Sequence, residues 1–383
     1  MDRRTLLKMT GYAGLAAAWT TTGCATAPAD NLAPEIANQT QWTVAPSIGL
    51  DACFALTIAG APETVMQVEH HLAHRAVLRD RLGPDGVEAA ETLMFALAQA
   101  GREATPGPGL AYVVSAGSMQ TLDGVISAMV EDGVLAAGLA DDPEYANPRA
   151  QANINRVRPI AEAAFRALQT AGYEQLWQAE SAPKLNAAAA ALRAELTEVD
   201  VITQHRRYLS RAFDPSVTLY ISELSEPHGI KITGQRFVTS PNYSTMLIRR
   251  IATHEMMHRL LDPERDETAR ILARLSDDPL MRSVLANADK AYGYTGNPDS
   301  VRGLVEEGGV QALEAVINEN LDQARDQGAY WRHQDGGMHI FAAATYARMH
   351  ATGFAETGGD FLAWLDQQTA DGSLLGAGLD AAA

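Results

Sequence analysis

The sequence predicts a predominantly helical α+β fold with a small mixed sheet. Three observations support this class. Stretches with helical periodicity cover most of the chain, whereas β-rich segments gather between residues 217 and 239. Directly after them, two histidines stand four residues apart within a helical stretch. Two histidines at that spacing lie on one face of a helix, which links the predicted fold to a chemical function.

The first 29 residues predict an export signal. Arg3-Arg4 precede a modest apolar run over residues 9–19, and the segment resembles a twin-arginine signal. The run is too short to span a membrane. Cys24 follows a stretch that resembles a lipoprotein box, although Thr21 departs from the aliphatic residue that such boxes prefer. We expect an exported protein that is periplasmic, or tethered to a membrane by lipidated Cys24.

The following residues predict a tether and then a helix-rich N-terminal region. Residues 30–48 are polar and proline-containing without periodicity, which is typical of an exposed tether. Residues 49–200 are expected to be mainly helical, with strands at 52–58 and 110–115. The predicted helices cover residues 62–82, 87–100, 118–139, 148–171 and 183–196.

Residues 201–375 are expected to form a second domain around the histidine motif. Residues 217–222 predict a strand, and residues 229–239 predict a β-hairpin around Gly234-Gln235. A helix should then run from Ser244 to about Leu261, capped by Asn242 or Ser244 and ended by Pro263. Residues 376–383 are expected to fray.

The histidine motif reads His254-Glu255-Met256-Met257-His258. Apolar residues flank it on both sides, which indicates a buried helix and not a solvated one. Both imidazoles can therefore bind one metal ion, and Glu255 lies on an adjacent part of the turn. A carboxylate there can take a proton from a water activated by the metal.

The motif and its surroundings resemble the zincin metallopeptidases. The metzincin subclass continues the motif as H-E-x-x-H-x-x-G-x-x-H, but Leu261 and Glu264 occupy the glycine and histidine positions here. The gluzincin subclass instead takes its third ligand from a glutamate on a later helix. Glu307-Gly308 resembles that helix, which implies Zn²⁺ bound by His254, His258 and Glu307. Glu306 stays an alternative, because a helical reading places it closer to the apolar stripe.

The resemblance implies further roles. The edge strand that pairs with an extended substrate would be residues 236–239. Asp262 is a candidate to hydrogen-bond a histidine ligand. Candidates for the residue that stabilises the oxyanion are Tyr330, His333, His339 and Tyr346.

Composition restricts the partners. A net charge of −17 argues against nucleic acid and against anionic membrane surfaces. Cys53 is expected to be a small buried residue without a disulfide partner. His70 and His74 also have helical spacing, but without an interleaved glutamate they indicate a polar helix face.

Together these observations lead to the hypothesis of an exported zinc-dependent peptidase acting on peptide or protein substrates, with Glu255 as general base. Two alternatives stay open. The chain is then either a non-enzymatic envelope lipoprotein with a structural metal site, or a hydrolase of non-peptide amides.

The N-terminal processing can be tested directly. If Cys24 is lipidated, mass spectrometry of the mature protein finds an N-terminal, acyl-modified Cys24. Cys24→Ala then releases the protein from membranes, because acyl chains supply the tether. An unmodified mature N-terminus at a neighbouring alanine or aspartate contradicts the lipoprotein hypothesis.

Overall fold

The computed structural model describes residues 40–63, 68–100, 106–140, 148–226, 229–292, 298–322, 331 and 337–382. Within these ranges the chain is predominantly helical and contains one small mixed sheet. This arrangement confirms the predicted fold class. The export signal, including Cys24, and residues 30–39 of the expected tether lie outside the described residues.

The sheet has four strands in the order β1-β2-β4-β3. β1 (Gln41–Pro46) pairs in parallel with β2 (Ser216–Ile221), and β2 pairs in parallel with β4 (Arg236–Thr239). β3 (Ile230–Lys231) is antiparallel to β4, which confirms the predicted hairpin. The tether prediction was wrong for Gln41–Pro46, which is a strand. β1 and β2 also join residues from both sides of the expected domain boundary at residue 200 in one sheet.

In the described parts between β1 and β2, the regular elements are all helices. They are α2 (Ile48–Gly60), α3 (Glu69–Ala100, kinked at Gly83), α4 (Pro106–Val114), α5 (Leu122–Val130), α6 (Asp132–Gly138), α7 (Pro148–Thr170), α8 (Tyr173–Leu176), the π-helix η2 (Trp177–Ser181), α9 (Ala182–Leu196) and α10 (Val201–Tyr208).

The strands predicted at residues 52–58 and 110–115 were wrong, because these segments belong to α2 and α4. Nearly every residue of α2 is buried. A helix that is buried on all sides has no polar stripe, so its periodicity does not distinguish it from a buried strand.

The C-terminal helices are α11 (Thr245–Met257), α12 (Asp266–Asp277), α13 (Pro279–Tyr292), α14 (Pro298–Asn320), α16 (Ile340–Ala351), α17 (Phe354–Thr357), α18 (Phe361–Ala370) and α19 (Ala377–Ala382). The prediction that the last residues fray was wrong for α19. Leu379 is fully buried, and Asp278 accepts a hydrogen bond from the backbone N–H of Gly376 at 2.7 Å.

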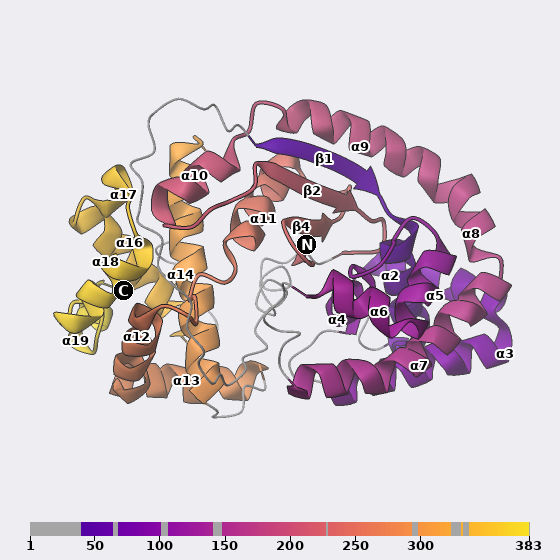
Figure 1. Cartoon of the computed structure of the whole chain (residues 1–383), viewed down its shortest axis with the longest axis horizontal. Helices are drawn as coiled ribbons and strands as arrows, with labels where there is room; N and C mark the ends of the chain where they lie inside the picture. Colours follow the sequence, from indigo (N-terminus) through magenta and orange to yellow (C-terminus); the bar gives the residue numbers. More distant parts are fainter. Residues whose placement is uncertain are drawn as a thin grey trace.

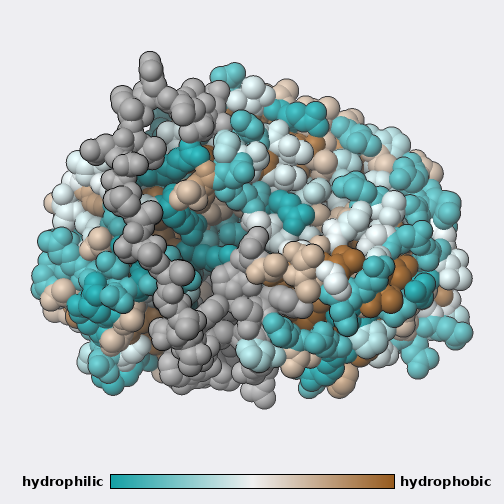
Figure 2. Space-filling model, viewed as in Figure 1, coloured by the Kyte–Doolittle hydropathy of each residue, from teal (hydrophilic) through white to brown (hydrophobic). Residues whose placement is uncertain are grey.

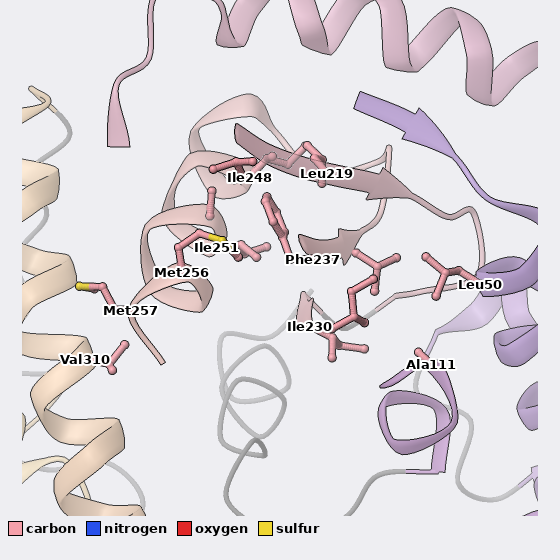
Figure 3. Packing of buried hydrophobic residues seen from close by; sticks show 14 of the residues in the cluster. Leu50, Ala111, Leu219, Ile230, Phe237, Ile248, Ile251, Met256, Met257 and Val310 are labelled. Atoms are coloured by element: carbon pink, nitrogen blue, oxygen red, sulfur yellow. The ribbon is translucent and has the colours of Figure 1, made fainter. Parts of the chain in front are cut away.

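The core holds α11 between the sheet and α14. Figure 3 shows Phe237 of β4 pointing toward Ile248 and Ile251 on one side of α11, while Met257 points toward Val310 of α14. Phe237 is fully buried. Truncating such a phenylalanine to alanine costs about 3–5 kcal/mol. Apolar packing on two sides therefore fixes the position of α11.

Helices α2 to α7 lie on one side of the sheet, α10 lies with the C-terminal helices on the other, and α9 runs along β1 (Figure 1). Arg193 of α9 donates a hydrogen bond to the carbonyl of Val44 at 2.8 Å, so α9 protects that edge of the sheet. In the same view, hydrophilic residues cover much of the visible surface (Figure 2).

A buried aspartate ties the N-terminal helices to the sheet. Asp51 of α2 is 1% exposed and accepts hydrogen bonds from Trp177 Nε1, at 2.7 Å, and from the hydroxyl of Ser222 at the end of β2. Burial, which outweighs these hydrogen bonds, raises the pKa of Asp51 from 3.8 to about 6.

This pKa predicts a pH-dependent stability. The folded protein retains the Asp51 proton up to a higher pH than the unfolded chain, so this group's contribution is greatest below pH 4 and is lost as the pH rises through 6. A shift of this size corresponds to about 3 kcal/mol. Asp51→Asn removes the titration. Urea denaturation should show that the free energy of unfolding falls less between pH 4 and pH 7 in this variant than in the wild type, and an equal fall contradicts the assignment.

Candidate metal centre

Helix α11 carries the histidine motif and ends inside it. The Ser244 side chain accepts a hydrogen bond from the N–H of Leu247 at 3.3 Å, which confirms Ser244 as the N-cap. The helix ends at Met257, so the predicted extension to Leu261 was wrong. His258 leaves the helix with φ −49° and ψ 145°, and Arg259 has a positive φ of 73°. The chain therefore turns sharply just after the second histidine.

A guanidinium group stabilises this helix end. Arg211 donates hydrogen bonds to the carbonyls of Met257 at 3.1 Å, of Met256 and His258 at 3.3 Å, and of Arg259 at 2.7 Å. The last carbonyls of a helix have no partner within the helix, and a cation there complements the helix dipole. Arg211 thus replaces the missing helical hydrogen bonds where His258 leaves the helix.

His254, His258 and Glu307 lie together and form what we call the central metal group. One ligand atom from each lies within 4.8 Å of the other two. The two imidazole ring centroids are 5.0 Å apart, and His254 Nε2 lies 3.6 Å from Glu307 Oε1. Both histidines are buried. The sequence therefore identified three side chains that the fold brings to one point.

The chemistry of this group fits a metal ion. His254 Nε2 is buried without a hydrogen-bond partner, although it faces a carboxylate. Leaving such a polar atom unpaired in the interior is costly, and a bound cation would satisfy it. Two imidazole nitrogens and one carboxylate oxygen are donors that suit zinc and other divalent transition metals.

Each histidine has a second carboxylate on its other ring nitrogen. His254 Nδ1 lies 3.2 Å from Glu314 Oε2, and His258 Nδ1 lies 3.8 Å from Glu306 Oε1. The contact with Glu314 is a hydrogen bond, and such a carboxylate fixes the orientation of a metal-binding imidazole and raises its basicity. The distance to Glu306 is too long for a hydrogen bond. The Nε2 atoms are consequently the ones directed toward Glu307 and Glu255.

Sequence reasoning missed Glu314. It lies two turns after Glu307 on α14, and Asn318 donates a hydrogen bond to it at 3.2 Å. Gln311 donates a hydrogen bond to Glu307 at 2.9 Å. These four polar residues follow one face of α14, at i, i+4, i+7 and i+11. That buried polar stripe is the signal in the sequence that could have identified Glu314.

His254 and Glu307 each shift the pKa of the other. Burial alone would lower the pKa of His254, but Glu307, Glu314 and Glu255 outweigh it and raise that pKa well above 6.5. Burial raises the pKa of Glu307, but His254 outweighs it and brings the value to about 2. A metal ion that binds here must therefore displace a proton from His254.

Glu306, the alternative ligand, has a different role. Its carboxylate accepts the backbone N–H groups of Leu260 at 2.7 Å and of Leu261 at 2.8 Å. It therefore holds the turn that follows His258 and lies outside the central metal group. Neighbouring glutamates on α14 thus serve the metal group and the turn separately.

Two glycines allow α14 to approach its neighbours. A Cβ atom on Gly308 would lie 2.9 Å from the Phe341 ring and 3.2 Å from the N atom of Ala342 in α16. A Cβ atom on Gly309 would lie 2.5 Å from the Leu260 side chain. These contacts are closer than side chains permit, so the Gly308-Gly309 pair permits the packing that places Glu307.

Glu255 faces the edge of the sheet. Its Oε2 accepts the backbone N–H of Lys231 at 3.0 Å and lies 3.9 Å from His258 Nε2. Lys231 belongs to β3, which is the edge strand. The prediction that Arg236–Thr239 is the edge was wrong, because β4 lies between β2 and β3. The prediction rested on order along the chain, in which residues 236–239 lie nearer to the histidine motif than β3 does.

The remaining candidates either do not belong to the central metal group or lie outside the described residues. Asp262 does not continue the α11 helix, and its carboxylate accepts the N–H of Glu264 at 2.9 Å. Tyr346 donates its hydroxyl hydrogen to Glu319. His339 is buried directly before α16. Tyr330 and His333 lie outside the described residues.

No protein-family model matches the sequence, and no curated protein or solved structure is detectably similar to it. Among the described helices, none combines the length and the apolar character needed to cross a bilayer.

The contact between Glu314 and His254 can be tested through metal affinity. Glu314→Gln keeps the side-chain size but removes the negative charge beside His254 Nδ1, so Zn²⁺ affinity should fall about 10- to 100-fold. Competition with a chromophoric chelator measures this change. Glu319→Gln is the matched control, because Glu319 lies on the same helix but contacts Tyr346 and His350. Equal affinities for the two variants would overturn the assignment.

Proposed function

We propose that this protein is a zinc-dependent peptidase that hydrolyses peptide bonds with an activated water. The observation that carries the proposal is the buried group of His254, His258 and Glu307, with Glu255 next to it. Three protein ligands are typical of catalytic zinc sites, whereas structural zinc sites have four. The resemblance of the H-E-x-x-H motif and the Glu307-Gly308 helix to gluzincins supports the same reaction class.

In this proposal His254, His258 and Glu307 hold the ion. A bound Zn²⁺ would lower the pKa of a water molecule and polarise the carbonyl that is attacked. Glu255 accepts the proton of the attacking water and passes it to the leaving amine. Its carboxylate is buried, and the backbone N–H of Lys231 fixes one of its oxygens.

The short edge strand β3 supports a peptide as substrate. The N–H of Ile232, directly after β3, donates to the carbonyl of Arg236 in β4. Backbone N–H groups of successive residues in a strand point in opposite directions, so the N–H of Ile232 faces β4. The N–H of Lys231 faces the other way, toward Glu255. An extended peptide that adds to this edge would pass beside the general base. In this reading β3 takes the role that the sequence had suggested for Arg236–Thr239.

We further propose that the reaction takes place outside the cytoplasm. This location rests on the twin-arginine-like signal over residues 1–29 and on the lipoprotein-like box before Cys24. The partners are then a peptide or protein substrate and, through Cys24, a membrane surface. Nucleic acid is disfavoured by the net charge of −17.

The proposal predicts the effect of removing the base. Glu255→Gln should lower kcat on a fluorogenic peptide library about 10²–10⁴-fold, because proton transfer contributes on that order. Zinc content, measured by mass spectrometry, should stay at the wild-type level. Glu264→Gln is the matched control, since Glu264 is an exposed residue shortly after the motif, and its kcat should not change.

Three results would contradict the peptidase. They are undiminished cleavage by Glu255→Gln, stoichiometric zinc in a protein that cleaves no peptide, and cleavage restricted to non-peptide amides. The second result favours a structural metal site, and the third favours an amide hydrolase.

A further inference from the structure

A second group of histidines lies at the start of α3. His70 and His74 are one helical turn apart, and their ring centroids are 5.9 Å apart. The corresponding distance between His254 and His258 is 5.0 Å. The two pairs thus have comparable spacing, although α3 carries no glutamate between its histidines. The sequence alone indicated a polar helix face for this segment.

The fold brings a carboxylate to this pair from a distant part of the chain. Glu223 lies two residues after the end of β2, and its Oε1 lies 3.9 Å from His74 Nε2. The other oxygen, Oε2, accepts a hydrogen bond from the Ser181 hydroxyl at 3.3 Å. Glu223 is therefore held in place by one oxygen while the other faces His74. Sequence periodicity could not show this partner, because it comes from another element.

His70 supplies a second observation. Its Nε2 atom is buried and has no hydrogen-bond partner. A solvated polar face does not explain a buried, unpaired ring nitrogen, because such an atom loses its water without compensation. A cation would satisfy it, as for His254 Nε2 in the central metal group.

The charge state of His74 also suits a ligand. Burial lowers the pKa of His74 below 6.5, and the attraction to Glu223 does not fully offset this effect. The imidazole is therefore neutral at pH 7, and a neutral imidazole is the form that binds metal.

We propose that His70, His74 and Glu223 form a second binding site for a divalent transition-metal ion of the Zn²⁺ or Cu²⁺ type. We call it the α3 metal site. Two imidazoles and one carboxylate favour these ions over Mg²⁺ and Ca²⁺, which prefer oxygen ligands. Among the described residues, the central metal group is the one whose ligand atoms are already within 4.8 Å of one another. For the α3 metal site to reach the same compactness, the His70 ring would have to turn toward His74.

Such an ion would join α3 to the segment after β2. That segment is already anchored to α2 by the hydrogen bond between Ser222 and Asp51. The α3 metal site therefore adds a cross-link between the N-terminal helices and the sheet, and it should stabilise the fold in proportion to its occupancy. This inference does not depend on the proposed peptidase activity.

Zinc stoichiometry tests the α3 metal site in the full chain. The apo wild-type protein, titrated with Zn²⁺ in a calorimeter, should bind about two equivalents, and a variant with His254→Ala and His258→Ala should bind about one. His74→Ala in the otherwise wild-type chain should also bind about one, and should still cleave peptides if the peptidase proposal holds. Zn²⁺ should raise the Tm of the His254→Ala/His258→Ala variant, and adding Glu223→Gln should abolish that rise.

His350→Ala is the matched control. His350 also contacts a glutamate, with Nε2 3.1 Å from Glu319 Oε2, and its side chain is 36% exposed compared with 38% for His74. It should leave two equivalents bound. A wild-type stoichiometry of about one, or unchanged zinc binding in His74→Ala, overturns the α3 metal site. The peptidase proposal would survive either result, because it depends on the central metal group.

Discussion

The interaction on which the centre of the structure depends is the buried contact between the histidines of α11 and the carboxylates of α14. Glu306, Glu307 and Glu314 all face these two imidazoles, and Glu255 adds another carboxylate. Burying so many ionisable groups costs free energy unless their charges are balanced. The neighbouring carboxylates raise the pKa of His254 well above 6.5 despite its burial, which offsets part of this cost. A divalent cation is the species that would complete this balance.

The same helices show how the backbone is shaped to present the ligands. His258 lies beyond the last helical residue, so its position depends on the turn and not on helical geometry. Arg211 holds the carbonyls before the turn, and Glu306 holds the N–H groups after it. The Arg211 guanidinium thus donates to the carbonyls before this turn, and the Glu306 carboxylate accepts from the N–H groups after it, so the backbone groups on both sides of the turn are hydrogen-bonded.

The sequence predicted the candidate ligands better than the residues that support them. His254, His258 and Glu307 could be identified because helical spacing and a glutamate-glycine pair are local patterns. Arg211 could not, because it contacts the helix end from a distant segment that carries no motif. Glu314 was accessible in principle, since its spacing from Glu307 is helical, but its meaning required knowing which face of α14 meets His254. The strand expected at residues 52–58 failed for another reason, since the almost fully buried helix α2 lacks the periodicity that identifies a helix.

The helix-rich N-terminal half also takes part in the centre. Ser115, directly after α4, exchanges hydrogen bonds with Thr233 in the hairpin loop, and Arg236 donates to the Ser115 carbonyl at 2.8 Å. That loop connects β3 to β4, so these contacts fix the strand whose Lys231 N–H holds Glu255. β3 is only two residues long, and so short an edge strand needs support beyond its own ladder. The N-terminal half supplies that support, and its residues share one sheet and one core with the C-terminal half.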